Sequence, residues 1–251
     1  MSEQALPVLV ADVRGVVDIG GVHGAEGTSH WKGLASRRDL RGQWEAVELA
    51  RVPPGGVSGE HRHTRTEEVY FVLSGQGEMV LDGQRHRVRA GCAVLTGLGT
   101  VHGLRNTGST DLDWITIEVL APATTDVQQG RDTTGTGFPL PRGGAVNAEV
   151  HDLTGGPVDT GSVFTGPLRR LAVRDIAPGE RAHVVADGVE HTLFVLSGAG
   201  LATGSLGEVP LRAGVSVTLP LGTAVELIAG DEGLRHFHAE LDVPEPRGGG
   251  R

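Results

Sequence analysis

Three histidines and one glutamate in the first half of the chain are of the residue types that hold a divalent metal ion. His61 and His63 are separated by one residue, so on a β-strand both side chains point to the same face. Glu68 follows His63 across a predicted turn, and His102 follows a glycine-rich turn. Imidazoles and a carboxylate suit Fe, Mn, Ni, Co, Cu or Zn. Four protein ligands would leave coordination positions open, as catalysis requires.

Two stretches around these residues resemble the signature motifs of the cupin superfamily. The first, G-x5-H-x-H-x3,4-E-x6-G, is matched by Gly55, His61, His63, Glu68 and Gly75. The second, G-x5-P-x-G-x2-H-x3-N, is matched by Gly91, Gly99, His102 and Asn106. Gly97 stands in place of the motif's proline, at a position that sets turn rigidity and supplies no ligand. The resemblance implies a jelly-roll barrel of the double-stranded β-helix type, with one metal ion held by His61, His63, Glu68 and His102.

Two alternatives concern the same segment. Alternating histidines in a polar stretch also occur on ordinary solvated strands, which would bind no metal. Glu67 would satisfy the shorter spacing of the first motif, but only Glu68 leaves six residues before Gly75. With Glu68 pointing inward, alternation predicts that Glu67 points outward.

Two further residues are candidates for a catalytic role. Tyr70, the only tyrosine, shares the predicted inward face of Glu68 and could line the pocket as a hydrogen-bond donor, or simply bond a backbone carbonyl. His30 precedes the motifs and could reach the pocket mouth. The histidines expected on the surface are His23, His86 and His151.

An internal repeat divides the chain into two copies of one module. Phe71–Gly77 recurs 123 residues later as Phe194–Gly200, and Arg89–Gly91 and Leu98–Thr100 recur at the same offset. The predicted domains are a metal-binding barrel over residues 1–125 and a second barrel over 145–246. A linker over 126–144 would join them, and residues 247–251 would form a disordered tail.

The second module has a ligand-type residue at only one of the four positions of the metal motif. The repeat offset places Val184, Ala186, His191 and Val225 where the first module has His61, His63, Glu68 and His102. The second barrel is therefore expected to keep the fold and lose the metal. A rival interpretation builds another site from His183, His191, His236 and His238. Because Phe237 and Ala239 form a competing apolar face, His236 and His238 are expected to point outward.

The elements that position these residues are predicted to be short β-strands. Apolar runs such as Glu68–Leu73 and Glu78–Leu81 end at the turn signals Ser74-Gly75 and Asp82-Gly83. Turn signals about every eight to twelve residues are typical of all-β sandwiches and barrels. The expected fold is therefore two cupin barrels in tandem, and the only segment with a helical pattern is 32–46.

Composition narrows the range of partners. The chain has 251 residues with a formal charge of −9, which argues against a nucleic-acid or anionic-membrane surface. One cysteine, Cys92, excludes an intrachain disulfide and a cysteine-rich metal site. No apolar run is long enough for a membrane span and no leader pattern is present, so a cytoplasmic location is expected. The expected partners are a small-molecule substrate and a second copy of the chain in a homodimer.

Three functional classes fit the motifs. The first is a metal-dependent enzyme without net redox change, such as a cyclase, isomerase, dehydratase or decarboxylase, and resembles cupins of bacterial secondary metabolism. The second is a cupin dioxygenase that uses Fe or another transition metal with O2. The third is a non-catalytic small-molecule-binding cupin. Fold and ligand set are shared across these chemistries, so the motif alone does not separate them.

Overall fold

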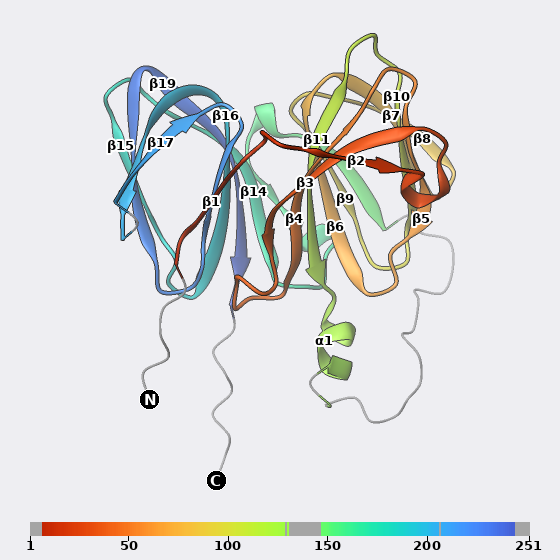
Figure 1. Ribbon diagram of the computed structural model, residues 1–251. Coiled ribbons are helices and arrows are strands. Elements are labelled where there is room, and N and C mark those ends of the chain that lie inside the picture. Colours follow the sequence, from red (N-terminus) through yellow and green to blue (C-terminus); the bar gives the residue numbers. More distant parts are fainter. Residues whose placement is uncertain (1–6, 129, 131–146, 206, 244–251) are drawn as a thin grey trace.

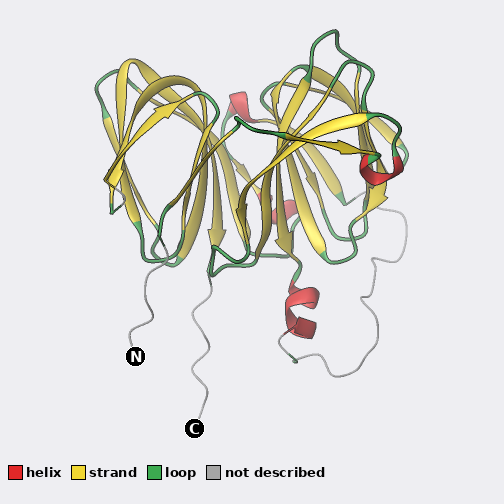
Figure 2. Ribbon diagram, viewed as in Figure 1, coloured by secondary structure: helices red, strands yellow, loops and turns green. Residues whose placement is uncertain are grey.

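The computed structural model describes residues 7–128, 130, 147–205 and 207–243. Within these residues the fold is nearly all β, as predicted, with one α-helix, α1 (Pro122–Gln128), and three single-turn 3-10 helices (Figure 2). Figure 1 shows two β-rich lobes side by side, with the strands of each lobe curving around an interior. No helix among the described residues has the length and apolar character needed to cross a membrane.

The N-terminal lobe consists of a seven-stranded and a four-stranded sheet, both antiparallel. The larger sheet has the order β12-β9-β6-β11-β4-β3-β2 and the smaller the order β5-β10-β7-β8. The strands are β2 (Val17–Gly20), β3 (Thr28–Ser36), β4 (Trp44–Val52), β5 (Val57–Arg62), β6 (Thr66–Ser74), β7 (Gln76–Leu81), β8 (Gln84–Arg89), β9 (Cys92–Thr96), β10 (Val101–Asn106), β11 (Leu112–Leu120) and β12 (Ala148–Asp152). A 3-10 turn, η1 (Val22–Gly24), lies against β5.

The C-terminal lobe is one eight-stranded sheet with the path β1-β18-β16-β19-β14-β13, to which β15 and β17 attach. Its two longest strands, β16 and β19, pair along most of their length. The strands are β1 (Leu9–Asp12), β13 (Val158–Asp159), β14 (Leu168–Ile176), β15 (Arg181–Val185), β16 (Val189–Gly204), β17 (Gly207–Arg212), β18 (Val215–Leu219) and β19 (Ala224–Asp242), with η2 (Leu153–Gly155) and η3 (Thr160–Ser162) ahead of β14.

Two short strands cross between the lobes. β1, near the N-terminus, pairs with β18 of the C-terminal lobe, and β12 pairs with β9 of the N-terminal lobe. The sheets therefore do not follow the expected sequence boundaries at residues 1–125 and 145–246. Each lobe receives one edge strand from the other half of the chain, which covers a sheet edge that would otherwise be open.

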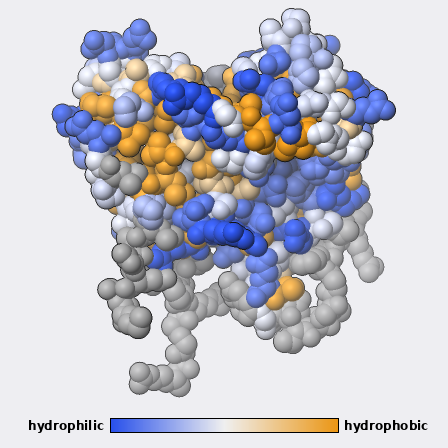
Figure 3. Space-filling view, in the orientation of Figure 1, coloured by the Kyte–Doolittle hydropathy of each residue, from blue (hydrophilic) through white to orange (hydrophobic). Residues whose placement is uncertain are grey.

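The two lobes pack sheet against sheet through a shared apolar core. The rings of Phe71 on β6 and Phe237 on β19 stack with centroids 4.3 Å apart, and Trp44 and Leu241 belong to the same buried cluster. Each lobe has a separate interior cluster on the other face of its sheet. Strands at the junction are therefore covered on both faces, whereas Figure 3 shows mixed polar and apolar surface around the outside.

The repeat is visible in the backbone. Gly75 and Gly198 have φ of 79° and 80°, and Gly91 and Gly214 have φ of 90° and 87°. These left-handed conformations favour glycine, so the turns that define the repeat need the same residue in both lobes.

Two expectations about local structure are wrong. The segment 32–46 carries no helix, because β3 and β4 occupy its ends. The helix instead lies at Pro122–Gln128 and overlaps the start of the expected linker 126–144. Pro122 suits a first helical position, and the Thr125 hydroxyl donates to Gln43 Oε1 at 2.8 Å. Most of the expected linker, and the tail 247–251, lie outside the described residues.

Candidate metal centre

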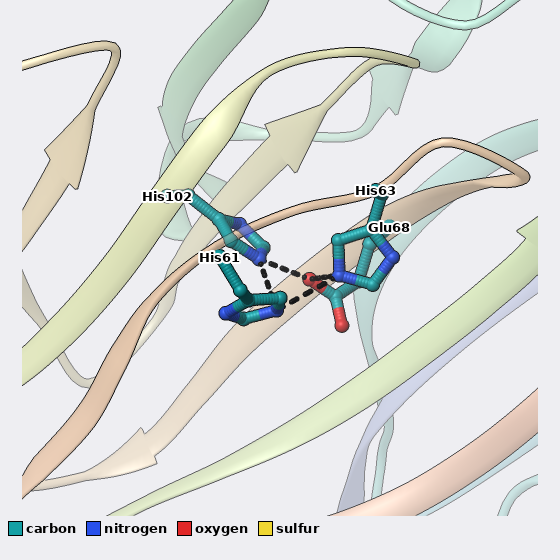
Figure 4. Close-up of side chains that lie close together, drawn as sticks. All are labelled: His61, His63, Glu68 and His102. Carbon is teal, nitrogen blue, oxygen red and sulfur yellow. Dashed lines mark hydrogen bonds and ion pairs between the residues drawn. The ribbon is translucent and has the colours of Figure 1, made fainter. Parts of the chain in front are cut away.

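The structure brings His61, His63, Glu68 and His102 together inside the N-terminal lobe. His61 lies on β5, His63 just beyond its end, Glu68 on β6 and His102 on β10. One ligand atom from each residue lies within 4.8 Å of those of the other three, and Figure 4 shows the four side chains converging on one point. No other group of three or more such side chains in the described part of the chain meets this condition.

Hydrogen bonds on the far side of two rings direct the remaining nitrogens toward this point. His61 Nδ1–H donates to the carbonyl of Gly59 at 2.9 Å, which leaves the Nε2 lone pair facing the centre. His63 Nδ1 lies 2.7 Å from the Thr66 hydroxyl, which fixes the orientation of that ring. Bonds of this kind to ligand histidines set both tautomer and ring angle in metal sites.

The donor set fits a cation. His61 Nε2 lies 3.0 Å from the Nε2 atoms of both His63 and His102. Glu68 Oε2 lies 2.9 Å from His102 Nε2 and is fully buried, without a hydrogen-bond partner among the described residues. Ligand atoms that sit at right angles around one ion, each about 2.1 Å from it, are about 3.0 Å apart. Lone pairs held this close repel one another unless a positive charge lies between them.

Burial keeps these imidazoles in the form that binds metal. It lowers the pKa of His61 and of His102 to about 4, and that of His63 to about 3, so all three are neutral near pH 7. Burial raises the pKa of the Glu68 carboxyl, and the nearby Glu48 raises it further. A dry carboxylate among neutral imidazoles is stabilised when a cation binds between them.

Further polar groups line part of the interior. Tyr70 is buried, as its predicted inward face requires, and its ring centroid lies 5.2 Å from that of His102. Glu118 pairs in register with Glu68 across β11 and β6, and burial raises its pKa to about 8. Trp31 donates to Glu48 at 2.8 Å. These last three side chains, Trp31, Glu48 and Glu118, line a cavity of about 540 Å³ in the same lobe.

His23 joins the site, although the sequence placed it on the surface. Its ring stacks on that of His61, with centroids 3.5 Å apart and planes 9° apart. It lies in η1 with a φ of 51°, a conformation uncommon outside glycine. Gly59 on β5 allows this approach, because a Cβ atom at that position would lie 2.2 Å from the carbonyl oxygen of His23. The only sequence signal was the polar, glycine-flanked turn itself.

His30 is not brought to the centre. Its Nδ1 lies 2.7 Å from Asp18 Oδ1 on the neighbouring strand β2, and about a third of its side chain is exposed. The next residue, Trp31, is the one that faces the interior cavity. The period of two along β3 therefore directs His30 to the opposite face.

Glu67 does not face solvent as expected. It alternates away from Glu68, but it is only 1% exposed because the start of the C-terminal lobe covers that face. Its carboxylate accepts hydrogen bonds from the Thr165 amide and hydroxyl at 2.8 Å and from the Gly166 amide at 2.9 Å. Glu67 is therefore a buried link between the lobes.

Glu190, at the repeat position of Glu67, forms the reciprocal link. Its Oε1 accepts from the amides of Arg41 and Leu221, each at 2.9 Å. Its Oε2 accepts from the Gly42 amide at 2.8 Å and from Trp44 Nε1 at 3.0 Å. Each lobe thus inserts one carboxylate into a loop of the other.

The second lobe lacks the metal ligands at the repeat positions but contains other histidines. Val184, Ala186 and Val225 are buried apolar residues, and His191 occupies the position of Glu68. The expectation that His236 and His238 point outward is wrong, because they are 3% and 5% exposed. The apolar face of β19 packs against the other lobe, so the opposite face, with both histidines, lines the interior of the C-terminal lobe.

Part of the chain is similar to known proteins. Residues 48–118 match the family model of the Cupin domain. All four residues of the cluster lie in that segment. The oxalate-binding protein of Thermotoga maritima is 28% identical over 102 residues, which are 41% of this chain and 84% of that protein. The dimethylsulfoniopropionate lyase DddW of Ruegeria pomeroyi is 30% identical over 97 residues, 39% of this chain and 63% of the lyase.

The whole chain is also similar in fold to a solved structure. Protein Ylba from E. coli has a TM-score of 0.71 with 12% identity, and 97% of each chain is covered. At this identity the likeness concerns the fold alone. Both lobes and their side-by-side arrangement therefore have a counterpart in a solved structure.

Proposed function

We propose that this chain is a two-barrel cupin enzyme in which the N-terminal lobe, approximately residues 1–125, holds one divalent transition metal. The proposed second barrel is approximately 145–246, and it supports the first. The reaction is non-redox chemistry on a small organic molecule, of the lyase, isomerase, cyclase or decarboxylase type. The observation that carries the proposal is the convergence of three Nε2 atoms and Glu68 Oε2, with neighbouring ligand atoms 2.9–3.4 Å apart.

The residues divide into holding and reacting groups. His61, His63, Glu68 and His102 would hold the ion, which would supply Lewis-acid activation of a carbonyl or enolate oxygen. Tyr70 and Glu118 are the interior groups that could donate or accept a proton, since one lies beside His102 and the other pairs in register with Glu68. The cavity of about 540 Å³ beside Glu118 has the volume of a small-molecule site, although its lining includes Glu118 and none of the four proposed metal ligands.

One relative supports the non-redox class, because the matched segment of a dimethylsulfoniopropionate lyase is 30% identical to this chain. The matched segment of an oxalate-binding protein is 28% identical and supports a small acidic ligand. Small acidic molecules are therefore the first substrates to test. His30 is no longer the favoured catalytic candidate, because its ring is paired with Asp18 on the other face of β3.

The test compares turnover with and without oxygen. Protein purified without added metal is analysed for its metal content and then assayed on a panel of small carboxylic and 2-hydroxy acids, both aerobically and anaerobically. The proposal predicts equal turnover under both atmospheres, and loss of turnover when the metal is removed. Turnover that stops without O2 would instead identify a dioxygenase, and metal-bound protein that only binds the acids would identify a non-catalytic cupin.

A further inference from the structure

A second cavity lies inside the C-terminal lobe, far along the chain from the metal motif. Its volume is about 580 Å³, within the range of small-molecule sites. His191 on β16 and His236 and His238 on β19 form its inner wall, and Arg174 and Glu240 line it as well. The aliphatic residues Ile176, Ala182, Val184 and Leu227 complete much of the lining.

The inner wall contains buried polar atoms without partners. His191 Nε2–H donates to the Val185 carbonyl at 3.1 Å, so its Nδ1 accepts from His238 Nε2–H at 3.0 Å. The Nδ1 atoms of His236 and His238 are buried, and neither has a hydrogen-bond partner within the described chain. His236 is only 3% exposed, and its side chain makes no hydrogen bond to the described part of the chain. Buried polar groups in proteins nearly always have a hydrogen-bond partner, so such atoms point to a missing partner.

The residues that line this cavity differ in type from those at the equivalent positions of the first lobe. The strand registers place His191 where the first lobe has Glu68, and place His236 and His238 where it has Trp114 and Thr116. A barrel that merely lost its metal would be expected to fill these positions with apolar side chains, as it does at Val184 and Val225. Three imidazoles in place of Glu, Trp and Thr instead make a polar inner wall.

The ion pairs at the cavity leave N–H groups of Arg174 available to a bound carboxylate. Glu240 is already paired with Arg174 at 2.9 Å, and Asp175 with Arg235 at 3.0 Å, so both carboxylates of the lining are neutralised by the protein. The bond to Glu240 uses Arg174 Nη2, and the other guanidinium nitrogens make no protein hydrogen bond among the described residues. The N–H groups of His191 and His238 are already used within the protein, so His236 is the imidazole that can turn an N–H toward a bound carboxylate.

We propose that this cavity is a second binding site, distinct from the metal centre, for a small organic molecule that carries one carboxylate. The carboxylate would accept hydrogen bonds from His236 and Arg174, and its organic part would contact Ile176, Val184 and Leu227. The site is metal-free, because its histidines do not form a group that meets the geometric condition satisfied by the first cluster. The proposal does not depend on the reaction proposed for the N-terminal lobe.

The test is an NMR titration of full-length protein with benzoate, a poorly chelating monocarboxylate, observed through the imidazole nitrogens. Benzamide, which has the same shape without the charge, is the matched ligand control. We expect benzoate to shift the His236 and His238 signals saturably and to bind at least about tenfold more tightly than benzamide. His61→Ala, which damages the metal centre, should leave benzoate binding unchanged.

Two variants locate the site. His236→Phe keeps an aromatic ring and removes both nitrogens, and should weaken benzoate at least about tenfold, with folding checked by circular dichroism. Arg174→Gln changes an exposed side chain and should weaken benzoate binding without affecting the fold. The control is His183→Gln, at an exposed position on the rim of the cavity, and it should leave benzoate binding unchanged. The absence of saturable shifts, equal binding of benzamide, or loss of binding in His61→Ala would overturn the proposal. So would displacement of benzoate by Zn²⁺ bound to these same imidazoles.

Discussion

Glu190→Gln is expected to weaken the junction between the lobes strongly, although it changes one atom and no volume. Each carboxylate oxygen of Glu190 accepts two hydrogen bonds, from Arg41 and Leu221 at one oxygen and from Gly42 and Trp44 at the other. Glutamine keeps a single acceptor oxygen, so whichever way the amide turns, two buried donors then face an NH2 group.

The magnitude follows from the number of bonds lost. Hydrogen bonds to charged groups contribute about 1.5–3 kcal/mol each, so the loss of two predicts about 3–6 kcal/mol of unfolding free energy. For a chain of this size, that corresponds to a drop in Tm of about 6 °C or more. Glu67→Gln should cost about half as much, about 1.5–3 kcal/mol, because the Thr165 hydroxyl can rotate to accept from the new amide and only one backbone donor is lost.

The assay is urea unfolding of both variants, followed by circular dichroism, with Glu208→Gln as the control at an exposed position. We expect the order Glu190→Gln, then Glu67→Gln, then a control close to the parent protein. A loss in Glu190→Gln below about 1 kcal/mol, or equal to that of the control, would show that these buried carboxylates do not hold the lobes together.

Four further outcomes are expected. Glu68→Gln removes the only anionic ligand and should lower metal affinity by more than the about 10–100-fold typical of residues that hydrogen-bond to the ligands. Glu67→Gln should keep its metal while losing stability. The reverse result would show that the motif is assigned one residue out of register. His23→Ala removes the ring stacked on His61 but no ligand, so metal should dissociate about 2–10-fold faster with unchanged stoichiometry, and an unchanged rate would show that the stacking is irrelevant. Burial, and then Arg174, lower the pKa of His236 to about 4, so between pH 6.5 and pH 4 the unfolded chain binds one more proton at this residue than the folded chain does. The contribution of His236 to the free energy of unfolding should be full above pH 6.5 and fall by about 1.4 kcal/mol per pH unit toward pH 4, in addition to the contributions of the other buried histidines. The total slope should therefore be smaller in His236→Leu than in the parent protein, and equal slopes would contradict this. A fragment of residues 1–125 lacks β12 and the covering lobe and should aggregate, so a soluble, active fragment would disprove the supporting role of the second lobe.

The candidate metal-binding cluster was predictable from the sequence because its motifs are local. The spacing of His61, His63 and Glu68 places them on, or just beyond, two consecutive strands of the chain, and the second motif places His102 on β10, which pairs with β5. The left-handed glycines of the repeat, such as Gly75 and Gly198, are likewise readable, because their backbone conformation restricts the residue type. The all-β class followed from the same turn signals.

The remaining features depend on long-range packing. Alternation correctly placed Glu67 and Glu68, and likewise Phe237 and His238, on opposite faces of their strands. It did not show that both faces of β6 and β19 are covered. Two sheets packed face to face bury residues that a single half-solvated sheet would expose. His23 was missed because a short turn without periodicity carries it onto His61, and no pattern in one sequence specifies where such a turn packs.

The most direct measurement is the metal content of the purified protein, determined by elemental analysis with the protein concentration measured independently. The account predicts about one equivalent of a divalent transition metal per chain, lost in the double variant His61→Ala/His63→Ala while circular dichroism shows the fold retained. About two equivalents in the parent protein, or metal retained by the double variant, would contradict a single centre built from His61, His63, Glu68 and His102.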